Sequence, residues 1–203
     1  MDIQRQRKLF DRQAEKYAKR VGKRGADHKW RKRLLSEAEG NILEISAGAG
    51  TNFPYYPGDA SITAVDFSPA MLEKARETAQ KENKKVTAFI SGNVETLDFP
   101  EHSFDTIVST LSMCAYPNPD HVLRLLSTWC HKDGRILLLE HGVSSNRVLA
   151  KLQDAFDPVF TKRVGCHINR DLMTLVHQAP VTIQREEHAL FGAVHLIWAK
   201  PNP

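Results

Sequence analysis

From residue 40 onward, short β-prone runs alternate with helical segments, and no other feature constrains the fold of this chain more. The β-prone runs cover residues 41–45, 61–66, 85–90, 104–109 and 135–140. Helical patterns at about 68–82 and 119–131 lie between them. Such alternation predicts a parallel sheet that is covered by helices on both faces. Two final runs, 181–188 and 193–199, flank a turn at 190–192 and predict an antiparallel hairpin at the end of the sheet.

The segment that follows residue 142 is less regular. A longer helix is expected over 145–163, with an interruption at residues 157–158 because proline cannot continue the helical hydrogen bonds. A second helix is expected over about 170–178, with Asn169 as its N-cap. Together with the strands, these elements predict one α/β domain over residues 38–203.

Residues 1–37 lack the β-prone runs of the rest of the chain and predict a helical extension, with a break near residues 21–25. Residues 1–33 hold 13 Lys and Arg against 4 Asp and Glu, whereas the remaining 170 residues hold 15 against 20. This asymmetry is typical either of a contact with nucleic acid or an anionic membrane, or of a solvated helix face. The sequence leaves these alternatives open.

Composition excludes several classes of protein. A hydrophobic share of 41% over 203 residues is enough for a packed core and excludes a disordered chain. The longest aliphatic run, residues 136–139, is too short to span a bilayer, and the N-terminal residues lack the apolar region of a secretory signal. Cys114, Cys130 and Cys166 lie far apart without a C-x-x-C pair, so we expect reduced thiols, no metal site and a cytoplasmic protein.

A loop of small residues follows the first strand, at 46–50. Small side chains at this position let the backbone approach a cofactor closely beyond the carboxyl end of the strand. The dinucleotide fingerprint needs a further glycine where Phe53 stands, and no G-K-[ST] of a phosphate-binding loop follows. Asp66 ends the second strand, where its carboxylate is placed to accept hydrogen bonds from the ribose hydroxyls of an adenosine cofactor.

These segments, in this order, resemble the motifs of class I S-adenosylmethionine-dependent methyltransferases over about residues 8–200. The first motif of that family, an acidic residue followed by small residues at alternate positions, corresponds to Glu44, Ser46, Gly48 and Gly50. Ser46 stands where the family more often has glycine. The segments that resemble the later motifs are 66–72, 92–94, 99–108 and 132–135. The resemblance implies a Rossmann-like, seven-stranded, mostly parallel sheet with the antiparallel hairpin at its end.

The resemblance also implies that S-adenosyl-L-methionine is the methyl donor and S-adenosyl-L-homocysteine its product. Asn93 would bond the adenine and Val94 would pack on it, while residues 1–33 would form a lid that places Tyr17 over the methionine part. The expected cofactor-binding residues are Tyr17, Glu44, Ser46, Ala47, Gly48, Gly50, Asn52, Asp66, Phe67, Met71, Asn93, Val94, Thr110 and Leu111.

A closer resemblance, carried by 52–57, 140–141, 156–158 and 165–170, is to a branch with alkyl-thiol S-methyltransferases and bacterial phospholipid N-methyltransferase-like proteins. It implies a small, largely apolar acceptor, with a thiol first and a lipid amine second. His141 is the predicted general base because imidazole titrates near neutrality. The residues expected to contact the acceptor are Met113, Tyr116, Phe156 and His167.

Two other functions remain open from the sequence. An RNA methyltransferase is compatible with the basic N-terminus, but the [N/D]-P-P-[Y/F] motif of adenine amino methylation is absent at 109–113 and no Pro-Cys occurs. A cofactor-binding module without catalysis is the second. We expect a small-molecule partner rather than nucleic acid, with a peripheral membrane contact through the basic N-terminal helix, and the sequence does not indicate an oligomeric state.

Overall fold

A computed structural model describes residues 3–23 and 25–202, and residues 1, 2 and 24 of the expected helical extension lie outside this part. Its centre is a seven-stranded sheet with the strand order β3-β2-β1-β4-β5-β7-β6. The strands are β1 (Asn41–Ile45), β2 (Ser61–Asp66), β3 (Val86–Ser91), β4 (Phe104–Thr110), β5 (Cys130–His141), β6 (Val181–Ala189) and β7 (Val194–Pro201). Strands β1 to β5 pair in parallel, and β7 pairs antiparallel with both β5 and β6. The predicted Rossmann-like fold and its C-terminal hairpin are confirmed.

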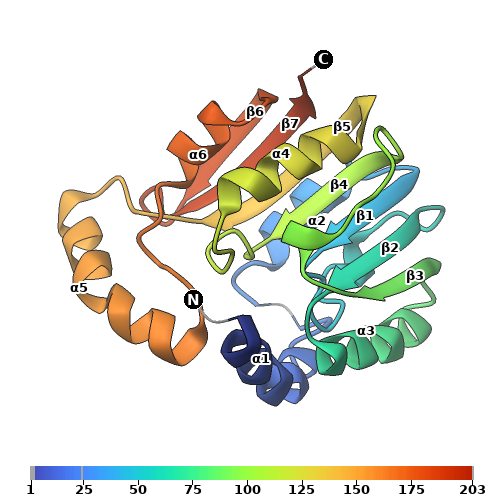
Figure 1. The fold of residues 1–203 in the computed structure, drawn as a ribbon, viewed down its shortest axis with the longest axis horizontal. Helices are drawn as coiled ribbons and strands as arrows, with labels where there is room; N and C mark the ends of the chain where they lie inside the picture. The colour runs from blue at the N-terminus through green and yellow to red at the C-terminus, as the bar shows by residue number, and fades with distance from the viewer. Residues whose placement is uncertain (1–2, 24, 203) are drawn as a thin grey trace.

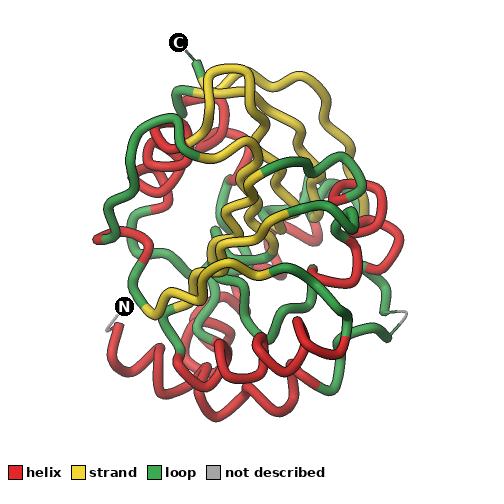
Figure 2. Tube along the Cα trace, turned by 90° about the vertical axis from the view of Figure 1, so that its right-hand side faces the viewer, coloured by secondary structure: helices red, strands yellow, loops and turns green. Residues whose placement is uncertain are grey.

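Helices flank the sheet on both faces, and Figure 2 shows the strands between them. The helices are α1 (Ile3–Ala18), α2 (His28–Leu35), α3 (Pro69–Lys81), α4 (Pro119–Trp129), α5 (Arg147–Val164) and α6 (Leu172–Gln178), with 3-10 turns η1 (Phe53–Tyr55) and η2 (Val94–Thr96). Helices α4 and α6 pack together over β5, β6 and β7, whereas α2 contacts β5 and β7, and α3 contacts β2 and β3. Among the described residues, no helix combines the length and apolar composition needed to cross a bilayer.

The strand order places a crevice at the end of β1. The chain runs outward from β1 to β2 and β3, then crosses back to form β4 on the other side of β1. The connections that leave β1 and β4 therefore diverge, and ligands of open α/β sheets bind in the crevice that this reversal creates.

Helix α1 packs against α3 and against the residues that immediately precede α3 (Figure 1). The ring of Phe10 meets that of Phe67 edge-on with 5.6 Å between centroids. The hydroxyl of Ser68 donates to Asp11 at 2.5 Å, and the same hydroxyl caps α3 by accepting from the Met71 amide. The N-terminal extension is thus fixed to the edge of the crevice by both apolar and polar contacts.

Two expectations about the later helices were wrong. Helix α5 continues through Pro158, so the proline costs a helical hydrogen bond without ending the helix. Asp157 accepts hydrogen bonds from His167 and from the amide of Ile168, which tie this turn to the loop after the helix. Helix α6 is capped by Asp171, which accepts from the Thr174 amide, rather than by Asn169.

Candidate functional site

A cavity of about 550 Å³ lies at the carboxyl ends of β1, β2 and β4. Its walls come from α1, from the segment that leads into α2, from the loop after β1 and from the ends of β2 and β4. Cavities of this size hold small molecules and cofactors.

The loop after β1 adopts a backbone that requires its glycines. Gly48 and Gly50 have φ of 55° and 77°, a region that costs a residue with a side chain about 1–2 kcal/mol. A Cβ on Gly50 would lie 2.7 Å from the Phe53 ring, whereas a Cβ on Gly48 would meet nothing within 4 Å. Gly50 is therefore needed for packing, and Gly48 leaves open space beside the cavity. Ser46 has φ of 49° despite its side chain, and its hydroxyl lies 2.6 Å from the Tyr116 hydroxyl.

Asp66 lies at the end of β2 and is 4% exposed. Its carboxylate accepts from the Gly48 amide at 2.8 Å and from the Ser68 amide at 2.9 Å. Burial raises the pKa of Asp66 to about 6. A carboxylate has about four lone-pair sites, so these backbone amides leave acceptor capacity for a donor in the cavity, such as a ribose hydroxyl.

Glu44 and Asn52 form a buried polar network beneath the cavity. Glu44 accepts from the Asn52 amide at 2.9 Å and from the Tyr56 hydroxyl at 2.8 Å, and burial raises its pKa to about 7. Glu44 is thus occupied mainly in holding the β1 loop.

Arg31 of α2 completes this network and was missed from the sequence. Arg31 is 6% exposed, and its guanidinium donates to the Asp27 carboxylate at 2.6 Å, to the side-chain oxygen of Asn52 at 2.5 Å and to the Thr110 hydroxyl at 3.0 Å. It is the only buried Arg or Lys of the described chain, and it lines the cavity. Asp27 four residues earlier was the available signal, since an i, i+4 acid fixes a guanidinium on a helix face.

Glu140 holds the loop after β4 and was also missed. This fully buried carboxylate accepts from the Ser109 hydroxyl at 2.6 Å and from the amides of Ser112 and Met113 at 2.9 and 3.1 Å. Burial raises its pKa to about 7. These bonds fix the turn at Leu111, whose φ is 53°.

Most of the expected cofactor residues come together in the cavity wall. Gly50 is the one member of that set that does not line the cavity. The members in the wall are Tyr17, Glu44, Ser46, Ala47, Gly48, Asn52, Asp66, Phe67, Met71, Asn93, Val94, Thr110 and Leu111.

The expected acceptor residues do not gather in the same way. Tyr116 lines the cavity, whereas Met113 is buried in the core. Phe156 is 55% exposed on α5, and His167 bonds Asp157 at 2.9 Å. Outside the cavity wall, His141 has its Nε2 3.2 Å from the Cys166 sulfur. The catalytic and acceptor roles of these residues stay predictions.

The residues in the wall fit an S-adenosylmethionine molecule. The buried carboxylate of Asp66 suits the ribose hydroxyls of the cofactor, and the open space at Gly48 lets the cofactor approach the backbone closely. The Arg31 guanidinium suits the carboxylate of the methionine part. Asn93 and the buried side chain of Val94 suit the adenine.

Comparisons with known proteins agree with this geometry. Residues 43–138 match the methyltransferase-domain family. The chain is 30% identical over 129 residues to a phosphatidylethanolamine N-methyltransferase of Cereibacter sphaeroides, covering 63% of each chain. It is 29% identical over 174 residues to a thiol S-methyltransferase of Mus musculus, covering 82% of this chain and 67% of that protein. The chain thus spans about two thirds or less of the length of these relatives.

Solved structures show the same fold at low identity. A SAM-dependent methyltransferase of Methanosarcina mazei superposes with a TM-score of 0.64 at 18% identity, covering 84% of this chain and 95% of that one. An O-methyltransferase family protein of Burkholderia thailandensis gives 0.69 at 15% identity, covering 87% and 56%.

Proposed function

Residues 43–138 match the methyltransferase-domain family, and we propose that the chain transfers a methyl group from S-adenosylmethionine to a small, largely apolar acceptor. This match and the two relatives described above bear out the family that the sequence motifs resemble. The observation that carries the proposal is the cavity at the ends of β1, β2 and β4, with the buried Asp66 carboxylate tied to the Gly48 amide.

The chain's own residues would bind and align rather than react. S-adenosylmethionine supplies, when bound, a methyl group that its sulfonium already activates. Asp66 would hold the ribose, Asn93 the adenine edge and Arg31 the methionine carboxylate. Tyr17 on α1 would help to exclude water, because α1 closes one side of the cavity.

For the acceptor we propose a thiol first and a lipid amine second. The activities for which the two relatives described above are named support these classes. The part of the cavity wall near α1 and the β4 loop is largely apolar and suits a hydrophobic acceptor better than a charged one. Its apolar members are Ile3, Phe10, Leu111, Ala115 and Pro117.

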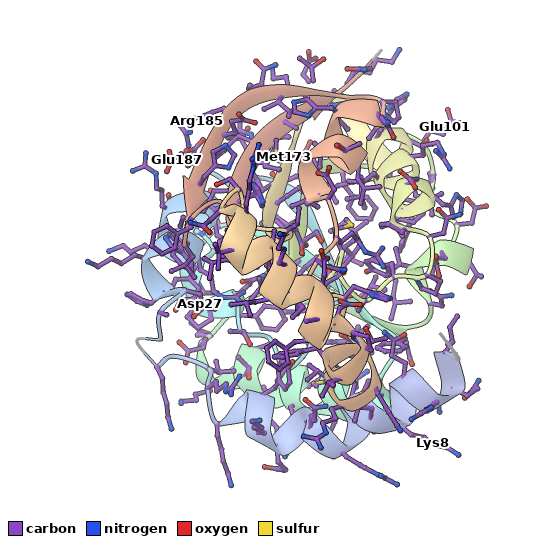
Figure 3. All side chains as sticks on the ribbon, turned by 90° about the vertical axis from the view of Figure 1, so that its left-hand side faces the viewer. Lys8, Asp27, Glu101, Met173, Arg185 and Glu187 are labelled. Atoms are coloured by element: carbon purple, nitrogen blue, oxygen red, sulfur yellow. The ribbon has the colours of Figure 1, made fainter. Side chains whose placement is uncertain are left out.

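Helix α5 supports an acceptor that arrives from a membrane surface. It is attached through polar side chains: Gln153 donates to the carbonyls of Gly142 and Ile168, and Asp157 is bonded to His167. Its apolar side faces outward instead, and Figure 3 shows α5 outermost on that side of the molecule. The exposed apolar residues are Val148, Leu149, Leu152, Phe156, Val159, Phe160 and Val164, with exposures from 36% to 69%.

The charge around this face points to an anionic phospholipid surface as its occupant. Helix α5 carries Arg147, Lys151, Lys162 and Arg163, and residues 1–33 hold 13 Lys and Arg. The turn between β6 and β7 adds Leu190 and Phe191, which are 60% and 72% exposed. An amphipathic helix with this composition is typical of interfacial membrane binding.

A panel of acceptors tests the proposed function. The protein is incubated with methyl-labelled S-adenosylmethionine and, separately, with a hydrophobic alkyl thiol, with phosphatidylethanolamine vesicles and with RNA. We expect labelled product from the thiol or the lipid. Label in RNA alone would overturn the acceptor class, and tight donor binding without any product would favour a non-catalytic module.

A further inference from the structure

Two cysteines and a histidine from three distant segments meet beside the cavity. The sulfurs of Cys114 and Cys166 and a ring nitrogen of His141 all lie within 4.8 Å of one another. His141 Nε2 and Cys166 Sγ lie 3.2 Å apart. In the described part of the chain, this is the only group of three or more potential metal ligands packed so closely.

Three separate elements deliver these ligands, and the surrounding structure fixes each of them. Cys114 follows the loop that Glu140 holds through its bonds to the Ser112 and Met113 amides. His141 is the last residue of β5 and pairs with Val194 of β7. The positions of the ligands are therefore set before any ion binds, which lowers the cost of ordering them.

The third ligand is fixed by the end of α5. Cys166 follows Gly165, which caps α5 with φ of 80°. The Gly165 carbonyl accepts from the side-chain amide of Gln6 at 2.9 Å. The amide of His167 donates to the Cys114 carbonyl at 3.0 Å and joins the two cysteine loops directly.

The three side chains have few other partners among the described residues. Beyond the cluster, the Cys114 sulfur has one hydrogen-bond partner in this part of the chain, the Leu111 carbonyl at 3.7 Å. The Cys166 sulfur likewise has one, the His167 carbonyl at 3.8 Å. Both distances are long, and both contacts are weak. Cys114 is 2% exposed, whereas His141 and Cys166 are half-buried, so an ion can reach the group from one side.

The spacing and chemistry of this group match one class of ion. Tetrahedral Zn²⁺ with bonds of about 2.3 Å to sulfur and about 2.0 Å to nitrogen places its ligand atoms roughly 3.5–3.8 Å apart, so shifts of about 1 Å or less would complete the site. Thiolate and imidazole together select zinc over magnesium or calcium. Two thiolates also neutralise the ion, which suits a half-buried position.

We propose that Cys114, His141 and Cys166 form a zinc site with a fourth position open to an exchangeable ligand such as water. Three protein ligands and an open fourth position are the arrangement of catalytic rather than structural zinc. The ion would clamp the loops after β4 and α5 to the end of β5, directly behind the cavity wall at Ser112 and Ala115. The absence of a C-x-x-C motif does not exclude this site, since the fold supplies the proximity that the sequence lacks.

The test measures metal binding, independently of methyl transfer. The 203-residue chain, reduced with a phosphine, is incubated with Zn²⁺, dialysed and analysed by elemental mass spectrometry. We expect one equivalent of zinc in the wild type and at least a tenfold lower content in Cys166→Ser. Cys130→Ser is the matched control, because Cys130 is a buried thiol at the other end of β5 and should leave the zinc content unchanged.

Cobalt substitution reports on the ligands themselves. With Co²⁺ the wild type should show near-ultraviolet thiolate-to-cobalt charge transfer and the visible bands of a tetrahedral ion, and His141→Ala should weaken the affinity at least tenfold. Less than a tenth of an equivalent of zinc in the wild type, or full occupancy in Cys166→Ser, would overturn the proposal. A Cys114–Cys166 disulfide in a non-reduced digest of freshly purified, zinc-free protein would overturn it as well.

Discussion

The carboxylate of Asp66 and the backbone amide of Gly48 lie 2.8 Å apart, so the end of β2 is bonded directly to the glycine loop that follows β1. This bond orients Asp66 toward the cavity and fixes the loop at the same time. Because charge-assisted hydrogen bonds contribute about 1.5–3 kcal/mol, Asp66→Ala should weaken S-adenosylhomocysteine binding roughly tenfold to a hundredfold. Calorimetry measures the dissociation constant, and Asp59→Ala, an exposed acid in the preceding loop, is the control. An unchanged constant in Asp66→Ala would remove Asp66 from the binding site.

Arg31 offers a test that separates the two ends of the cofactor. Arg31→Gln should weaken the binding of S-adenosylhomocysteine about tenfold or more, because the charged partner of its carboxylate is lost. The same variant should bind adenosine, which has no carboxylate, as the wild type does. Arg33→Gln is the control, since Arg33 lies on the same helix but is exposed and pairs with Glu187. Equal losses for both ligands would show that Arg31 acts only by supporting the fold.

The packing of α1 predicts how the cavity closes. Phe10→Ala removes the ring that meets Phe67 and should loosen α1 from α3, so that bound S-adenosylhomocysteine dissociates several-fold faster. Stopped-flow measurement of the dissociation rate checks this expectation. Lys8→Ala, an exposed change on the same helix, should leave the rate alone. If Phe10→Ala releases the ligand at the wild-type rate, α1 is not a lid.

The outward apolar face of α5 predicts binding to anionic vesicles. Burying one large apolar side chain contributes about 1.5–3 kcal/mol, so the double variant Leu152→Asp/Phe156→Asp should bind at least tenfold more weakly. Sedimentation with phosphatidylglycerol–phosphatidylcholine vesicles measures the binding, which should also fall with salt. Gln80→Asp on α3 adds a charge at another exposed position and is the control. Failure of the wild type to bind these vesicles would contradict the membrane role of α5.

Glu44 predicts a pH dependence of stability. Its pKa is raised from 4.5 to about 7 by burial, so the unfolded state releases this proton first as the pH rises. The contribution of protonated Glu44 is fully present below about pH 4.5 and is lost as the pH rises through about 7, with a total of about 3 kcal/mol. Urea unfolding across this range should therefore show a flatter pH dependence in Glu44→Gln. Glu101→Gln, on the exposed turn before β4, should retain the wild-type slope, and equal slopes in all three proteins would contradict the assignment.

The strand–helix alternation and the motifs around Asp66 and Asn93 were enough to predict the sheet and most of the cavity wall. These features are local, because a strand end and the loop after it are adjacent in the sequence. Arg31 was not singled out, because the pairing with Asp27 was the only local signal and Arg31 stands among many Lys and Arg that tertiary packing leaves exposed or half-buried. The meeting of Cys114 with Cys166 also depends on the path of the chain between them, which no local pattern encodes.

The central claim is that the cavity at the ends of β1, β2 and β4 is a methyl-donor site. A crystal structure of the complex with S-adenosylhomocysteine tests it most directly. The account predicts the ribose hydroxyls on the Asp66 carboxylate, the adenine beside Asn93 and the ligand's carboxylate on Arg31. A ligand bound elsewhere, or one that leaves Asp66 without contact, would contradict it.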